Sequence, residues 1–416
     1  MAQRWPDGAA VSRTDALLET NMPRVSWRCM LDPTYTAALE RLHGFIPSAG
    51  RDYAAKRNYD DIEHVSILSP YIRHRIITEE DVLRATLARH SPQTAEKFIQ
   101  EVYWRTYWKG WLEMRPGVWT AYKTDLHAAL NRVQTESGLR QEWEAACKGE
   151  TGIECFDHWA NQLTDTGYLH NHARMWFASI WIFTLRLPWT LGADFFMRHL
   201  LDGDPASNTL SWRWVGGLQT IGKTYLARSD NIAKYTNGQF KPTGLATQAV
   251  PLDGPPHPAR GPVPVSDVID PNLRTGLLLT EDDLSPGWLL EKVSPAATAV
   301  VQTTAKRSPL AVSPLVTNFA SRAMQDCTTR FAEKLSRVDV VAPDAVRTWA
   351  QVNDIAQVIT SQMPVGPVAD ALQGLAIKQI IRPCDGNAWP HATHGFFRFK
   401  EKIPKLLGQI KGLATV

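Results

Sequence analysis

Apolar residues recur every three or four positions through most of residues 1–240, the spacing that places them on one face of a helix. Few of these residues follow the two-residue alternation of a half-buried strand. Helices are therefore predicted at Glu79–Arg89, Gln93–Glu113, Gly167–Leu185 and Leu191–Leu201. We expect one helix to begin after Thr78, which three acidic residues follow, and another to begin at Ser91-Pro92.

The pattern changes twice after residue 240. Residues 241–272 combine many prolines with glycines and polar residues, which predicts an extended linker. Beyond it, short apolar runs alternate with helical stretches, an order typical of a small parallel α/β sheet. The runs are Thr275–Thr280, Val338–Val341 and Ile377–Ile381, and the helical stretches are Arg322–Leu335 and Asp344–Thr360. No G-x-G-x-x-G follows any run, so a dinucleotide site is not predicted there.

Composition narrows the class of protein. The formal net charge is +3, and residues 1–240 hold 27 Lys and Arg against 27 Asp and Glu, so any nucleic-acid binding must use a local patch. The five cysteines are scattered without a CxxC pair, so we expect no metal site and no disulfide framework. No apolar run approaches the roughly 20 residues of a membrane span, and no signal peptide is evident, so a soluble, cytoplasmic protein is expected.

Residues 200–214 carry an unusual set of side chains. Asp204 before Pro205 indicates a helix start, with a capping oxygen followed by a residue that needs no N–H partner. A helix from there places Asp204, Asn208 and Trp212 on one face. A carboxylate, an amide and an oxidisable indole together favour the wall of a redox-cofactor pocket over an ordinary core.

Three further segments are candidates. The predicted helix over 93–113 places Glu101, Trp104, Trp108 and Trp111 on one side with Arg105 at its border. A packed Trp stripe explains Trp108 and Trp111 equally well, but a buried Glu101 is costly unless it bonds a partner.

In the second segment His170 alone is typical of a core histidine, whereas Arg174 requires an anion, which Asp202 or Asp204 could supply. The third, Val65–Ile72, presents hydroxyls and free N–H groups at a helix start, which favours phosphate, although many ordinary helices begin in this way.

These segments together resemble the flavin domain of the photolyase/cryptochrome family. VSILSPYI, EVYWRTYW, TGIECFD, GYLHNHARM, Trp189, LLDGDPASN and SWRW occur in the family's order over roughly residues 50–228. The resemblance implies a mainly α-helical FAD-binding domain of photolyase type over 1–240. The pattern of residues adds a linker over 241–272 and a small Rossmann-like α/β domain over 273–416. We expect no N-terminal antenna domain and no antenna chromophore, and the C-terminal segment fits a relocated equivalent of that domain.

The resemblance assigns residues to the cofactor. The implied FAD contacts are Tyr53, Ser66, Ile67, Leu68, Ser69, Arg105, Arg174, Asp202, Gly203, Asp204 and Asn208. Arg174 is expected to pair with Asp202, and Asn208 to face the reactive ring nitrogen of the flavin. Trp212 and Trp189 match the first two members of an electron-transfer chain, and Trp143 is a candidate third by approximate position.

Other residues are assigned to DNA. The implied contacts with UV-damaged DNA are Arg57, Glu101, Trp104, Asn171, Met175 and Trp214. The 6-4 photolyases have histidines at the positions of Asn171 and Met175, so the resemblance favours cyclobutane pyrimidine dimers. The expected function is light-driven repair by a monomer, with electron transfer from reduced FAD to a flipped-out dimer. A cryptochrome-like photoreceptor without repair activity, and a degenerate FAD fold that binds DNA or protein, remain alternatives.

Overall fold

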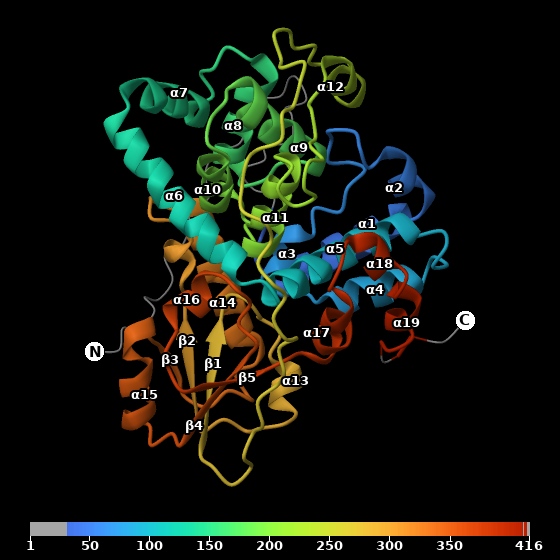
Figure 1. Cartoon of the computed structure of the whole chain (residues 1–416). Coiled ribbons are helices and arrows are strands. Elements are labelled where there is room, and N and C mark those ends of the chain that lie inside the picture. Colours follow the sequence, from blue (N-terminus) through green and yellow to red (C-terminus); the bar gives the residue numbers. More distant parts are fainter. Residues whose placement is uncertain (1–30, 411, 414–416) are drawn as a thin grey trace, which may run out of the picture.

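The computed structural model describes residues 31–410, 412 and 413, and its helical part extends to residue 235. Figure 1 shows these helices gathered above a parallel sheet. Their bounds are α1 Tyr35–Phe45, α2 Arg51–Lys56, α3 Ser69–Arg73, α4 Glu79–Leu87, α5 Glu96–Glu113, α6 Gly117–Thr135, α7 Ser137–Lys148, α8 Glu154–Thr166, α9 Asn171–Ser179, α10 Trp189–His199, α11 Pro205–Val215 and α12 Ser229–Tyr235. The 3-10 helix η2 spans Ile46–Ser48, and the π-helix η3 spans Ile180–Thr184.

Local capping explains why one predicted helix start is confirmed and two others are wrong. Thr78 and Asp81 form a reciprocal capping box, so α4 begins as predicted. The start expected at Ser91-Pro92 is wrong, because the Ser91 hydroxyl accepts a hydrogen bond from the Thr94 N–H in a local turn and α5 begins only at Glu96. Gly167 closes α8 at φ 70°, so the helix expected from Gly167 begins instead at Asn171.

The C-terminal part is built on five parallel strands in the order β3-β2-β1-β4-β5, which confirms the predicted α/β class. The strands are β1 Thr275–Thr280, β2 Ala297–Val301, β3 Val338–Val340, β4 Gln357–Ser361 and β5 Ile377–Ile380. In the central strand, Gly276 lies opposite Ala297 on one side and Val358 on the other. All six residues of β1 are buried, as expected for a parallel strand with both faces covered.

The two faces of the sheet belong to different cores. Leu278 points into a small core closed by α15 (Val346–Val352) and α16 (Pro367–Ala371). Leu277 and Leu279 join the main core, which is continuous with that of the helical part. The remaining helices of this part are α13 Gly287–Leu290, η4 Thr304–Lys306, α14 Pro314–Arg330 and η5 Pro343–Ala345.

Two predictions in this part were wrong. The stretch 344–360, expected to be helical, is α-helical only over Val346–Val352, directly after η5, and its end forms β4, with every residue buried in the sheet. Strand β2 was not predicted, although Ala297–Val301 is also fully buried. Short apolar runs of this kind fit a helix or a strand equally well until their neighbours are known.

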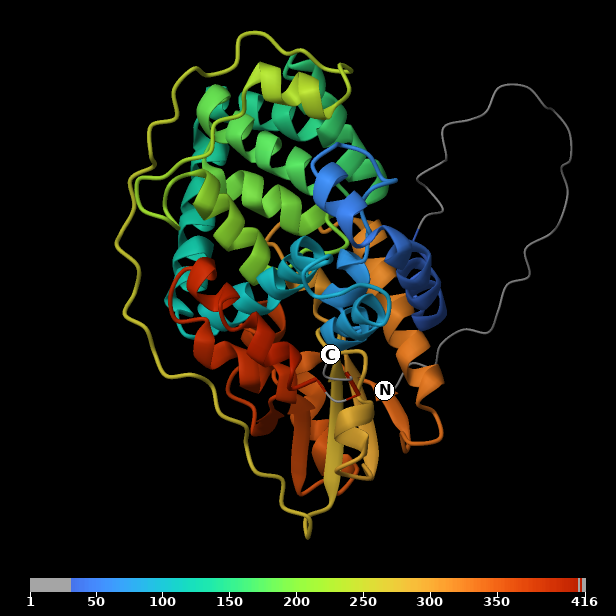
Figure 2. The same cartoon turned by 90° about the vertical axis from the view of Figure 1, so that its right-hand side faces the viewer.

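The segment 241–272 has no regular structure and runs along the outside of the molecule (Figure 2). Its backbone N–H groups bond both parts of the chain. Leu252 N donates to Gly216 O at 2.9 Å, Gly261 N to Met114 O at 2.8 Å, and Asp267 N to Gln379 O at 3.0 Å. The segment is therefore a surface strap that connects the helical part to the sheet.

The chain after β5 returns to the helical part. Its helices are α17 Pro383–Ala388, η6 Trp389–His391, α18 Phe396–Lys400 and α19 Ile403–Leu407. Tyr107 on α5 donates its hydroxyl to His394 O at 2.7 Å, and Arg115 donates to Thr393 O at 3.0 Å. Phe396 and Phe399 belong to the main core. The last helices thus cover α5 rather than the sheet.

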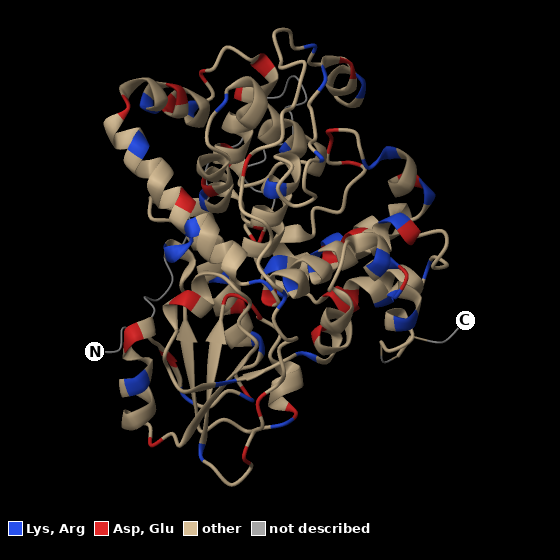
Figure 3. Ribbon diagram, in the orientation of Figure 1, with Lys and Arg blue, Asp and Glu red and all other residues tan. Residues whose placement is uncertain are grey.

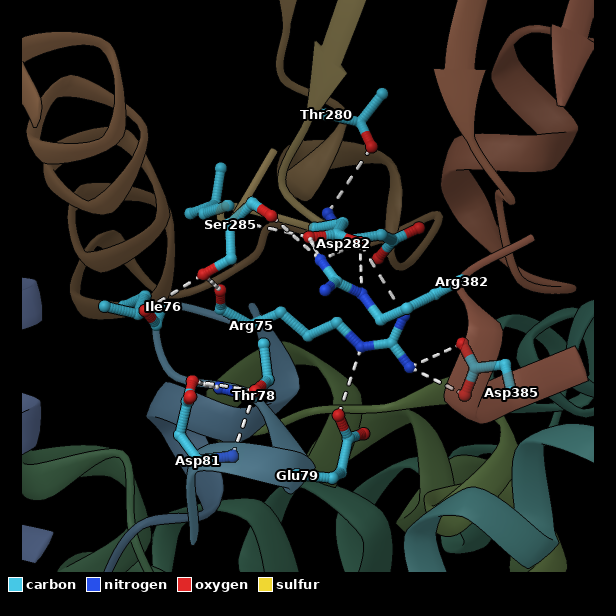
Figure 4. A network of polar contacts seen from close by, with 12 residues as sticks. Arg75, Ile76, Thr78, Glu79, Asp81, Thr280, Asp282, Ser285, Arg382 and Asp385 are labelled. Carbon is cyan, nitrogen blue, oxygen red and sulfur yellow. Dashed lines mark hydrogen bonds and ion pairs between the residues drawn. The ribbon is translucent and has the colours of Figure 1, made fainter. Parts of the chain in front are cut away.

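Buried ion pairs connect the carboxyl end of β1 to the start of α4 (Figure 4). Arg75 Nη2 bonds both carboxylate oxygens of Asp385 at 2.8 and 2.6 Å, and its Nε donates to Glu79 at 3.2 Å. Arg382 bonds Asp283 at 2.7 Å. All five side chains are buried, so each charge depends on its partners for solvation.

Across the described residues, no helix is both long and apolar enough to span a membrane. The same residues contain no group of three or more His, Cys, Asp or Glu side chains placed to hold a metal ion.

Glu79→Gln tests the buried network. Burial alone would raise the pKa of Glu79, but the Arg75 guanidinium and the Lys109 ammonium lower it from 4.5 to about 2. The ionised form therefore stabilises the fold above pH 4.5, and this stabilisation is lost as the pH falls toward 2. We expect the variant to lose about 3 kcal/mol of unfolding free energy at pH 7, measured by urea unfolding.

The difference between wild type and variant should shrink between pH 4.5 and 2. Glu142→Gln, on the exposed surface of α7, is the control and should stay within about 0.5 kcal/mol of wild type. A difference that does not change with pH would show that the charge of Glu79 is not what stabilises the fold.

Candidate functional site

The predicted site residues come from helices that meet in the middle of the molecule. Helix α11 contacts both α5 and α9, and the turn over 200–204 connects α10 to α11. Segment 65–69 leads into α3, next to the same turn, since Arg73 at the end of α3 donates to Gly203 O at 2.9 Å. Residues separated by more than 100 positions in the sequence are thus brought together.

Arg174 pairs with Asp202, as the resemblance implies. Arg174 Nη2 lies 3.0 Å from Asp202 Oδ2, and its Nε donates to Leu169 O at 2.9 Å. Burial alone would raise the pKa of Asp202, but Arg174 lowers it below its ordinary value, so the carboxylate is ionised at neutral pH. Its other oxygen, Oδ1, is buried without a hydrogen-bond partner.

Asp204 caps α11, as the sequence predicts. Its side chain accepts the Ser207 N–H at 2.7 Å, and Pro205 is the first helical residue. Asp204 Oδ2 also lies 3.7 Å from Arg73 Nε and 3.7 Å from Arg105 Nη1. Burial would raise the pKa of Asp204, but Lys109, Arg105 and Arg73 hold it well below its ordinary value.

Asn208 and Trp212 follow Asp204 on the same helix, and both are buried. Asn208 Nδ2 donates to Ala193 O at 2.8 Å, which fixes the amide plane. The Trp212 indole is T-shaped against Phe196 at 5.2 Å, and its Nε1 is buried without a partner. The predicted face of carboxylate, amide and indole is therefore a face of α11 that is buried within the protein.

Segment 65–69 contains a strained residue. Ile67 has φ 51°, a left-handed conformation that is rare for a β-branched side chain, and it is buried. The Leu68 N–H bonds the Ser66 hydroxyl at 3.3 Å, and Ser69 helps to lower the pKa of Asp202. The segment predicted to contact phosphate is thus held in an unusual backbone shape next to the Asp202 turn. Tyr53 is buried against Phe98, which lies in the first turn of α5.

The residues predicted to face DNA lie on the outer part of α5. Glu101 forms an ion pair with Arg57, and both side chains are about one-third exposed. Trp104, one turn further along α5, is half-buried, and Phe396 stacks on it with ring centroids 3.6 Å apart and planes 12° apart. The sequence did not predict Phe396, because its contact with Trp104 spans almost 300 residues.

The other predicted DNA contacts lie on α9 and α11. Asn171 is exposed and Met175 is half-buried on α9. Trp214 is half-buried and stacks on Tyr225 at 5.6 Å. The His170 side chain caps α9 by accepting the His172 N–H at 3.1 Å, and burial lowers its pKa to about 4. His170 is therefore neutral at pH 7, in agreement with the structural role the sequence favoured.

The ring contact described for Trp189 is with Tyr122 and not with Trp143. The ring centroids of Trp189 and Tyr122 lie 5.8 Å apart, and those of Tyr122 and Trp119 lie 5.1 Å apart. Trp119 Nε1 donates to Asp370 Oδ2 at 2.9 Å. Among the ring contacts described for residues 31–410, none joins Trp143 to this row.

Two buried cations near Asp204 were missed by the sequence analysis. Lys109 is 1% exposed, its Nζ has no hydrogen-bond partner, and burial lowers its pKa. Arg73 Nη1 bonds Asp282 at 2.6 Å, in the sheet part. Lys109 follows Arg105 by one helical turn in a helix rich in aromatic residues, so the sequence alone could have placed it beside Arg105 on the same face. The Arg73 partner, 209 residues away, was not readable from the sequence.

The residues around the turn suit a flavin. Buried polar groups in stable proteins normally have partners, yet Asp202 Oδ1, Arg105 Nη1 and Trp212 Nε1 are buried without one. They provide one acceptor on the turn, one donor on α5 and one donor further along α11. An isoalloxazine ring offers both N–H and C=O groups, so these unpartnered atoms fit the predicted cofactor.

Comparisons with known proteins match the helical part of the chain to flavin-binding proteins. Residues 98–244 match the family model described as the FAD binding domain of DNA photolyase. The chain is 30% identical over 189 residues to a deoxyribodipyrimidine photo-lyase of Alkalihalophilus pseudofirmus, a match covering 45% of this chain and 39% of that protein. It is 34% identical over 194 residues to that of Thermus thermophilus, covering 45% and 43%.

Among solved structures, the chain is similar to a bacterial class III photolyase from Agrobacterium tumefaciens. The identity is 26%, the TM-score is 0.40, and the match covers 49% of this chain and 43% of the other. The chain thus spans about two fifths of the length of the relatives it matches. The matched region contains α5, α9, α10 and α11, the helices that build the site. Residues 98–244 therefore form a helical FAD-binding domain of the photolyase/cryptochrome type, with FAD as its cofactor.

Proposed function

We propose that this protein is a DNA photolyase that uses light and reduced FAD to split cyclobutane pyrimidine dimers. The observation that carries the proposal is the arrangement of α5. Arg105 points toward the buried Asp204 on the cofactor side, while Glu101 and Trp104, within one turn of it, are partly exposed. One helix thus presents neighbouring residues to the cofactor and to solvent.

The exposed residues suit a flipped pyrimidine dimer. The Glu101 carboxylate can accept hydrogen bonds from pyrimidine N–H groups, and Arg57 keeps it in place. The exposed part of the Trp104 indole can stack on a base, which recovers about 1–3 kcal/mol per base. Phe396 supports the indole from one face, which limits its rotation.

The chemistry requires no acid at the lesion. When bound and reduced, FAD supplies the electron that opens the cyclobutane ring. On this chain, His170 is neutral because burial lowers its pKa, and the positions next to it carry Asn171 and Met175. No protonated histidine is therefore provided on this side, which favours cyclobutane dimers over lesions that need proton donation.

The rival function is that of a cryptochrome-like photoreceptor. Such a protein needs the same cofactor site but has no need of a partly exposed carboxylate beside an aromatic ring. Illumination of the reduced protein with an oligothymidylate that contains a cyclobutane dimer separates the two. Loss of the dimer, followed by chromatography of the products, supports the enzyme, and a yellow protein that leaves the dimer intact supports the receptor.

Glu101→Ala should weaken binding of the dimer by about tenfold and lower the repair yield, because a hydrogen bond to a charged group contributes about 1.5–3 kcal/mol. The FAD content should not change, since the Glu101 side chain is about one-third exposed and pairs with Arg57. Glu142→Ala on α7 is the matched control. An unchanged yield in Glu101→Ala would remove this carboxylate from the lesion site.

Trp212→Phe should abolish light-driven reduction of the bound flavin, because phenylalanine is far harder to oxidise than tryptophan. Repair by protein that has been reduced chemically should be retained. Absorbance during illumination with a thiol reductant measures the first property, and the dimer assay measures the second. If photoreduction persists, electrons arrive by another route, for which Trp181, 6.2 Å from Trp212, is the nearest described indole.

A further inference from the structure

The C-terminal helices bring a distinct surface next to the candidate site. Helix α18 contains three phenylalanines in five residues. Phe396 and Phe399 are buried against α5, and Phe396 stacks on Trp104. Lys400 on the same helix pairs with Glu96, the first residue of α5, at 2.9 Å. This places α18 alongside the part of α5 that carries Glu101 and Trp104.

Phe397 points away from this packing. It is 81% exposed, and it is the one aromatic residue among the exposed large hydrophobic side chains of residues 31–410. An exposed phenylalanine contributes nothing to the core, since its neighbours Phe396 and Phe399 already fix the helix. Its ring is therefore available to a partner.

The same surface is basic. Residues 391–410 contain four Lys and Arg against one Glu, an excess equal to the formal net charge of the entire chain. Arg398, Lys402 and Lys405 are exposed. Figure 3 shows Lys and Arg along α18 and α19, on the side of the molecule opposite α15. The local patch that nucleic-acid binding requires thus lies next to the candidate site.

We propose that Phe397, Arg398, Lys402 and Lys405 form a second DNA contact, which holds the strand beside the lesion. Phe397 stacks on a nucleobase, and the three cations bind neighbouring phosphates. An exposed aromatic ring among cations is the arrangement by which proteins bind single-stranded nucleic acid. The proposal rests on the proposed function, because it takes the strand that enters at Trp104 as the occupant.

DNA fits this surface better than a protein partner does. A protein-binding site of similar size needs a continuous apolar area, whereas here one exposed ring stands among positive charges. The packing of Phe396 on Trp104 also makes the new surface continuous with residues expected to touch the lesion. A strand flipped out at Trp104 would therefore pass close to α18.

The test uses the full chain with FAD and measures fluorescence anisotropy of labelled oligothymidylates, with and without one cyclobutane dimer. Phe397→Ala should weaken binding of both oligonucleotides about fivefold or more. In the double variant Lys402→Ala, Lys405→Ala, log affinity should fall less steeply with log salt concentration, and the magnitude of the slope should be smaller by about one to two. Val352→Ala and Arg347→Ala, two exposed residues of α15, are matched controls that should bind as wild type.

The outcomes separate this inference from the proposed function. If wild type prefers the dimer and repairs it, but the Phe397 and lysine variants bind as wild type, the α18–α19 contact is wrong. If wild type neither prefers nor repairs the dimer, the proposed function is wrong, and the variants still test DNA binding on undamaged oligonucleotide. Thermal unfolding and FAD content should match wild type for all variants, because the changed side chains are exposed.

Discussion

The acidic turn after β1 is the constraint on which the arrangement of the two parts depends. Three consecutive carboxylates, Glu281, Asp282 and Asp283, are buried where the central strand ends. Asp282 bonds Arg73 and Asp283 bonds Arg382, while Arg75 lies 3.7 Å from Asp283. Buried charges of this kind must keep their partners, because an unpaired charge costs several kcal/mol. These buried pairs therefore tie the sheet to the helices in the orientation observed.

This junction also sets the electrostatics of the cofactor side. Arg73 binds Asp282 and at the same time donates to Gly203 O, beside Asp204. Lys109 and Arg105 on α5, together with Arg73, keep the pKa of Asp204 well below its ordinary value, so Arg73 acts on both the acidic turn and Asp204. The sheet part is thus more than an appended domain, since removing it would leave Arg73 without its closest carboxylate and change the charge around the turn.

The sequence allowed prediction of features set by local chemistry. The capping residues Thr78 and Asp204, the face of α11 and the pairing of Arg174 with Asp202 all follow from spacing or from the family's motifs. What could not be predicted depends on contacts across the chain. Strand β4 was predicted as helix because a short apolar run acquires its structure from its neighbours. The stacking of Phe396 on Trp104 could not be predicted, because the two residues are almost 300 positions apart.

Helix α5 connects the candidate cofactor site to the partly exposed residues Glu101 and Trp104. Arg105 and Lys109 in its middle lie near Asp204, the partly exposed Glu101 and Trp104 lie within one turn of Arg105, and α18 packs against Trp104. Its apolar residues are buried on several sides at once, so the helix has little freedom to rotate or slide. A group that binds at Glu101 and Trp104 would therefore meet a surface held by the same helix that carries Arg105 and Lys109, which is what the proposed electron transfer over a short, constant distance requires.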